Sequence, residues 1–93
     1  MDQWLEKTPL LGDVELREIG NIICEKRTAR GWSQNDLAGC LGSDYRVVSR
    51  HENGHGMNLE SLVRYSKVFD CSITALLPAK FRQNISSQLL EVL

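Results

Sequence analysis

Two arginines in the middle of the chain could hydrogen-bond to the edges of DNA bases. Arg46 and Arg50 stand four residues apart in the stretch DYRVVSRHENG, which we expect to be helical, so both lie on one face. A guanidinium matches the O6 and N7 acceptors of guanine with two parallel hydrogen bonds. Tyr45 and Ser49 share this face, and Tyr45 could contact a thymine methyl group or a phosphate. The alternative interpretations are a solvated helix face for the arginines and packing over a turn for Tyr45.

No residue pattern indicates catalysis or a metal site. The sequence has no hydroxyl, histidine and carboxylate cluster typical of a catalytic triad and no glycine-rich phosphate loop, so we expect no enzyme. His51, His55 and Cys40 lack the closely spaced cysteine pairs of zinc sites, and Gly54 interrupts the helix between the histidines. We therefore expect no metal and no cofactor.

Composition fits one small globular domain. The chain has 93 residues, of which 42% are hydrophobic and 25% charged. Its net charge of −1 argues against a general polyanion binder but allows a local basic face. The three cysteines, an odd number without a CxxC pair, favour reduced thiols. No segment resembles a signal peptide or a membrane span, so we expect a cytoplasmic location and no membrane partner.

Capping residues and apolar spacing predict five short helices and no strand. Small polar residues mark where helices begin, and glycines mark where they end. The expected N-caps are Asp13, Ser33, Ser43 or Asp44, Asn58 and Ser72, and the expected stops are Gly31, Gly42 and Gly54.

The same spacing predicts which side chains face the core. They recur every three or four residues along each expected helix. The predicted core-facing residues are Leu16, Ile19, Ile23, Leu37, Ala38, Leu41, Val48, Leu59, Leu62, Val63, Ser66, Phe69, Ile73, Leu76 and Leu77.

Small residues between two of these helices predict a helix-turn-helix. Two helices joined by a turn of three or four residues cross steeply and approach closely. Ala38 suits the close approach, and Gly42 suits a left-handed residue in the turn. Such an arrangement leaves the outer face of the second helix free to enter a major groove.

The sequence resembles the Cro/phage-repressor (XRE) family of helix-turn-helix DNA-binding domains over residues 19–77. The resemblance rests on the segments IGNIICEKRTARGWSQNDLA, VSRHENG and LESLVRYSKVFDCSITALL and on Gly42 between them. It implies an all-α, five-helix lambda-repressor-like domain over residues 13–78. It also implies a DNA-binding set made up of Ser33, Gln34, Asn35, Asp44, Tyr45, Arg46, Ser49, Arg50, Asn53 and His55.

Within that set, the resemblance implies different roles. Gln34 and Asn53 match phosphate-binding positions, and Gln34 can also buttress the recognition helix. His55 stands where a basic residue is common, whereas Asp44 replaces a frequent Ser or Thr and brings a negative charge near a phosphate. A separate pair, Arg27 and Glu52, is implied to form a structural salt bridge.

Both ends of the chain carry apolar residues outside this domain. Residues 1–12 form an extension that we expect to cover an exposed apolar pair, Ile22 and Cys24, on the first helix. The alternative is that its apolar residues form part of a surface for a partner. Residues 79–93 are expected to form a C-terminal helix that mediates homodimerisation. Its apolar stripe consists of Phe81, Ile85, Leu89 and Val92.

The sequence as a whole predicts a sequence-specific regulator of transcription, most simply a repressor, that binds a double-stranded DNA operator as a homodimer. The alternative is a protein-interaction module of the same fold, such as an antitoxin-like or partner-controlled subunit with weak DNA binding. The net charge of −1 and Asp44 favour this alternative, whereas Arg46 and Arg50 oppose it.

Overall fold

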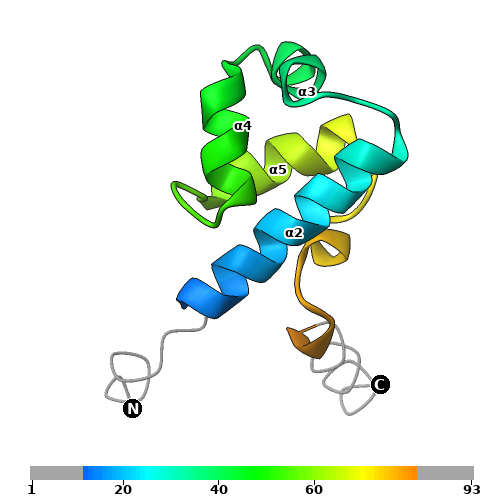
Figure 1. Cartoon of the computed structure of the whole chain (residues 1–93). Coiled ribbons are helices and arrows are strands. Elements are labelled where there is room, and N and C mark those ends of the chain that lie inside the picture. Colours follow the sequence, from blue (N-terminus) through cyan, green and yellow to red (C-terminus); the bar gives the residue numbers. More distant parts are fainter. Residues whose placement is uncertain (1–11, 82–93) are drawn as a thin grey trace.

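The computed structural model describes residues 12–81 and is all-helical over that range, as expected. Figure 1 shows α3 and α4 meeting at a corner, with α2 and α5 packed behind them. Residues 79–81 begin a further helical segment after Pro78. The elements are α2 (Asp13–Ala29), α3 (Gln34–Leu41), α4 (Tyr45–Glu52), α5 (Leu59–Val68) and the short 3-10 helix η1 (Ile73–Leu76).

Side-chain caps fix where the central helices begin. The Ser33 hydroxyl accepts the Asp36 N–H at 3.0 Å, and the Asp36 carboxylate accepts the Ser33 N–H at 2.8 Å, which forms a capping box at the start of α3. Asp44 caps α4, and Asn58 caps α5 by accepting the Ser61 N–H at 2.8 Å. These reciprocal bonds satisfy helix N–H groups that would otherwise lack partners.

Two of the expected caps are wrong. Gly12 occupies the N-cap position of α2, and Asp13 is the first helical residue, where its carboxylate still complements the helix dipole. Ser72 precedes η1 but makes no capping bond, because its hydroxyl pairs with that of Thr74 at 2.8 Å. The expected fifth helix is therefore a single 3-10 turn.

The core is formed by residues from all five elements. Tyr65, whose ring is fully buried in the middle of α5, was not among the expected core residues. Leu59 was expected there but is 69% exposed, because it stands at the first position of α5, beyond the elements that cover the rest of its face. The buried apolar residues are Ile19, Ile23, Leu37, Ala38, Val48, Leu62, Tyr65, Phe69 and Leu76.

The expected exposed apolar pair on the first helix is also wrong. Ile22 is half-buried and packs against the core, and Cys24 is half-buried with its Sγ 3.5 Å from an Arg27 nitrogen. Each of the two side chains is therefore partly, not fully, exposed. The extension expected to cover them, residues 1–12, lies outside the described residues apart from Gly12.

Gly20 allows α2 to lie directly against the end of α4. A Cβ atom at this position would lie 2.6 Å from the His51 carbonyl oxygen and closer still to that of Glu52. Real Cβ atoms do not approach backbone atoms so closely, so only glycine fits here. This contact determines how far α4 stands from α2 and therefore where its outer face points.

Candidate nucleic-acid interface

The turn between α3 and α4 has the geometry expected of a helix-turn-helix. Gly42 adopts a left-handed conformation with φ of 66°, and its N–H bonds to the Gly39 carbonyl at 3.2 Å. The following N–H, from Ser43, bonds to the Ala38 carbonyl at 2.9 Å. These two bonds end α3 and allow α4 to start three residues later, so the helices cross at the corner visible in Figure 1.

Helical periodicity divides α4 into an outer and an inner face. Tyr45, Arg46 and Arg50 are exposed, and Ser49 is half-buried beside them, as the expected DNA-contacting face requires. Val48, on the inner face, is fully buried in the core. The outer face therefore carries two guanidinium groups, a phenol and a hydroxyl, none of which is needed for core packing.

Glu52 is the centre of a polar cluster that anchors the end of α4. Its carboxylate accepts Arg27 Nε at 2.6 Å, Arg27 Nη2 at 3.1 Å and Gln34 Nε2 at 3.0 Å. Arg27 also donates to the Trp32 carbonyl at 2.8 Å. The side chains of Arg27 and Glu52 are only 12% and 8% exposed, so the pair joins α2 to α4 with little water around it. Gln34 adds the start of α3 to the cluster.

The charges of this cluster are mutually stabilised. Burial of the Glu52 carboxyl raises its pKa, but the hydrogen bonds from Arg27 and Gln34 and the Arg27 charge outweigh burial and leave the pKa below its usual value. The hydrogen bond to Glu52 likewise raises the pKa of Arg27. The structure thus forms the ion pair that the resemblance implied and adds Gln34 to it, in the buttressing role.

Asp44 has a second partner besides the helix backbone. Its carboxylate accepts the Arg46 N–H at 2.8 Å and also Arg46 Nε at 3.0 Å and Nη2 at 3.2 Å. These hydrogen bonds lower the pKa of Asp44 and raise that of Arg46. Asp44 was expected as a possible N-cap and as a negative charge near a phosphate, and the structure confirms the cap. Its pairing with Arg46 was not anticipated.

The remaining expected DNA-binding residues lie near the two ends of the motif. Ser33 and Asn35 are exposed at the start of α3, next to Gln34. Asn53 is exposed at the end of α4, where its amide donates to the Ser49 carbonyl at 2.8 Å, and His55 is exposed two residues further on. All of these stand at helix ends or in a turn, where phosphate contacts from a helix-turn-helix are made.

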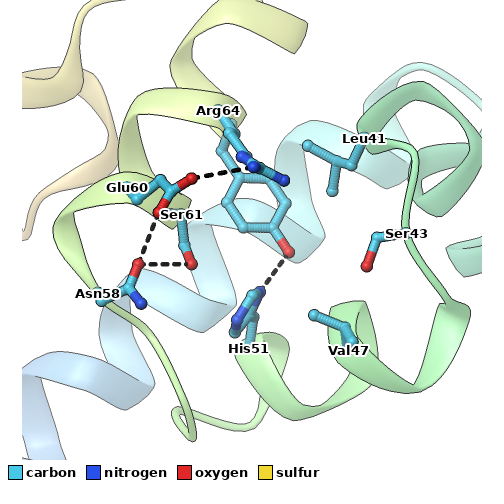
Figure 2. Close-up of a pocket in the computed structure, with 9 residues that line it drawn as sticks. Leu41, Ser43, Val47, His51, Asn58, Glu60, Ser61 and Arg64 are labelled. Atoms are coloured by element: carbon cyan, nitrogen blue, oxygen red, sulfur yellow. Dashed lines mark hydrogen bonds and ion pairs between the residues drawn. The ribbon is translucent and has the colours of Figure 1, made fainter.

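Sequence reasoning missed a buried pair behind α4. His51 is 8% exposed, and its Nδ1 lies 2.7 Å from the Tyr65 hydroxyl of α5. Both residues line a hollow of about 190 Å³ between α4 and α5, together with Leu41 and Val47. Figure 2 shows His51 beside Val47 on α4, with Leu41 on the other side of the hollow. Burial lowers the pKa of His51, and the positive charge of Arg50 lowers it further.

His51 should make the domain less stable in mild acid. Its pKa is lower when folded, so the unfolded chain binds a proton first, and stability is lost as the pH falls below about 6.5. The free energy of unfolding of the wild type should therefore decrease between about pH 7.5 and about pH 5.5. His51→Gln should flatten this dependence in urea titrations. The exposed His55 serves as control, and a flattening by His55→Gln in place of His51→Gln would contradict the assignment.

The structure describes only the beginning of the expected dimerisation segment. Of the predicted dimerisation residues, only Phe81 is described, and it is half-buried, while Ile85, Leu89 and Val92 lie outside residues 12–81. Lys80, beside Phe81, pairs with Glu15 of α2 at 3.4 Å. Over the described part of the chain, no helix is long and apolar enough to cross a membrane.

Comparison with known proteins places the same motif in regulators and in an enzyme chain. The chain is 33% identical over 75 residues to a protein of Haloquadratum walsbyi named as a predicted HTH-type transcriptional regulatory protein, covering 75% of this chain and 23% of that one. A protein of Methanoregula boonei with the same description is 31% identical and covers 77% and 24%. The chain therefore spans about a quarter of the length of these curated relatives.

Two solved structures share the fold. The restriction-modification controller protein C.AhdI of Aeromonas hydrophila matches with a TM-score of 0.63 and 30% identity, covering 67% of this chain and 96% of that one. Hydroxypropylphosphonic acid epoxidase from S. wedmorenis matches with a TM-score of 0.66 and 28% identity, covering 72% of this chain but 36% of that one. The family profile described as helix-turn-helix matches residues 25–76, more than half of the chain. With the left-handed turn at Gly42 and the exposed outer face of α4, these matches establish that the chain belongs to the Cro/phage-repressor type of helix-turn-helix family.

Proposed function

We propose that the chain is a sequence-specific double-stranded-DNA-binding regulator of transcription. In this proposal α4 enters a major groove and its outer face contacts base edges, while the start of α3 and the end of α4 contact the phosphates that flank them. The chain acts in the cytoplasm and represses by occupying an operator that RNA polymerase needs.

The observation that carries the proposal is the contrast between the anchored inner side of α4 and its accessible outer face. The Glu52 end is fixed by Arg27 and Gln34 and is nearly inaccessible, whereas Arg46 and Arg50 are free of the core and exposed. Recognition of DNA bases requires a firmly anchored helix with accessible guanidinium groups, because a loosely held helix loses the geometry of bidentate contacts. The relatives named as HTH-type transcriptional regulatory proteins support the regulatory role.

Selection from a random pool of DNA duplexes tests the proposal. The full chain is incubated with the pool, bound duplexes are enriched and sequenced, and the affinity of the best one is compared with that of a shuffled duplex. We expect specific binding to exceed nonspecific binding by about a thousandfold or more. Equal affinity for both would reject the proposal and favour a protein-interaction module, a role consistent with the net charge of −1.

We also propose that the chain binds DNA as a homodimer. Two copies place two recognition helices in successive major grooves, and a palindromic selected site would support this arrangement. The apolar stripe of residues 79–93, with Phe81 at its start, supplies the contact between copies, and residues 1–12 pack beside the first helix. Sedimentation equilibrium of the full chain tests the assembly, and a monomer at operator-binding concentrations would contradict it.

A further inference from the structure

The carboxylate of Asp44 binds the Arg46 guanidinium and the Arg46 N–H at the same time. Oδ1 accepts hydrogen bonds from the Arg46 N–H and from Arg46 Nε, and Oδ2 accepts one from Nη2. The same carboxylate therefore caps α4 and holds the Arg46 side chain. Both side chains are open to solvent, at 76% exposed for Arg46 and 47% for Asp44. In the proposed function, the surface that carries this pair faces the DNA.

The pair leaves a defined part of the guanidinium available. Asp44 occupies the edge formed by Nε and Nη2, whereas the Nη1 end carries no partner among residues 12–81. Guanidinium donors have a fixed planar arrangement, so the free end still matches the O6 and N7 acceptors of guanine. The ion pair at the same time favours one of the many rotamers of the long arginine side chain before DNA arrives.

Asp44 also changes how Arg46 interacts with the DNA backbone. An isolated arginine beside the groove is drawn to any phosphate, and that attraction carries no sequence information. With the Asp44 carboxylate 3.0 Å from Arg46 Nε, its negative charge offsets much of the attraction between Arg46 and a phosphate that is not in direct contact with it. Arg50, by contrast, has no carboxylate within ion-pair distance in the described part of the chain, so it keeps its full charge.

We propose that Asp44 is a positioning residue for base recognition, which holds Arg46 for one guanine and suppresses its attraction to phosphates. The proposal rests on the proposed function and specifies how that interface discriminates. It does not concern folding, because an exposed ion pair contributes little to stability. Its distinctive consequence is that removing the acid should strengthen binding to nonspecific DNA while weakening discrimination.

The test is Asp44→Asn in the full chain, since asparagine keeps a capping oxygen but loses the charge. Fluorescence anisotropy measures affinity for the selected duplex, its single-base variants and a shuffled duplex, at two salt concentrations. The base read by Arg46 is the one whose preference disappears in Arg46→Ala. At that base, Asp44→Asn should reduce discrimination by about fivefold or more, whereas the other bases keep their preference. The slope of log K against log salt for the shuffled duplex should steepen by about 0.9.

Two further variants separate this role from simpler ones. Glu60→Gln removes the same charge from an exposed pair with Arg64 on α5, and it should leave discrimination unchanged. Asp44→Ser, which caps a helix but is too short to hold Arg46, should reproduce Asp44→Asn. Unchanged discrimination in Asp44→Asn, or equal effects from Glu60→Gln, would overturn the positioning role. A wild type without any base preference would instead reject the proposed function, and this inference with it.

Discussion

Gly20→Ala should destabilise the folded domain by about 3 kcal/mol. The added methyl group would meet the carbonyl oxygens of His51 and Glu52, which belong to the backbone and cannot rotate away. To make room, α4 would have to move from α2, which would also loosen the packing around Val48. Urea denaturation followed by circular dichroism measures the loss as a lower midpoint at an unchanged slope.

Gly39→Ala is the matched control. Gly39 also lies inside a helix, but a Cβ atom there would have nothing within 4 Å. Because both substitutions reduce the freedom of the unfolded chain equally, their difference reports the contact with α4 alone. Gly39→Ala should stabilise the chain by up to about 1 kcal/mol. Similar effects of the two substitutions would contradict the close approach of α2 and α4.

Glu52→Ala should cost a further large amount of stability, about 3 kcal/mol, because it leaves the nearly buried Arg27 guanidinium without its counter-charge. Gln34 would lose its acceptor in the same step. Thermal denaturation of the variant should show a clearly lower midpoint, and binding to DNA should weaken as α4 loses its anchor. The stability that ionised Glu52 contributes is complete above about pH 4.5 and is lost as the pH falls through its lower pKa in the folded state.

Two variants test this explanation. Glu60→Ala removes a carboxylate from the exposed pair with Arg64 and should cost only about 0.5 kcal/mol. The double variant Arg27→Met with Glu52→Ala should be more stable than the sum of the single effects implies, because no unpaired charge remains. A loss from Glu52→Ala as small as that from Glu60→Ala would show that the Arg27–Glu52 pair carries little of the anchoring.

Features determined by neighbouring residues could be predicted from the sequence. The N-cap at Ser33, the left-handed turn at Gly42 and the cap at Asn58 each depend on residues a few positions apart, so the sequence pattern predicts them. The exposed face of α4 follows in the same way, since helical spacing places Arg46 and Arg50 opposite the buried Val48.

Contacts between helices could be predicted only in part. The Arg27–Glu52 pair joins residues 25 positions apart and came from the family resemblance, not from a local pattern. Gly20 looks like a weak helix position until α4 is placed against it, and His51 gives no sign of its partner Tyr65, 14 residues away. Such requirements arise from packing in three dimensions, which no helical period encodes.

The predictions for surface side chains failed for a different reason. Ile22 was expected to be exposed on the first helix, but it packs against the core, because its burial depends on how the helices of this chain meet. The Asp44–Arg46 pair was missed because residues two apart do not face each other within a helix. Asp44 is the N-cap, however, and its extended backbone turns the carboxylate toward Arg46.

The central claim, that the outer face of α4 recognises bases, is tested most directly by Arg50→Ala on a panel of single-base variants of the selected duplex. Asn53→Ala, at a position in the turn after α4 that we expect to contact a phosphate, is the control, and the thermal midpoint of each variant checks folding. We expect Arg50→Ala to cost about 1–3 kcal/mol per half-site on the selected duplex and to abolish preference at one base, while Asn53→Ala weakens every duplex by the same factor. An equal loss on all duplexes with Arg50→Ala would make Arg50 a phosphate contact and contradict base recognition by this residue.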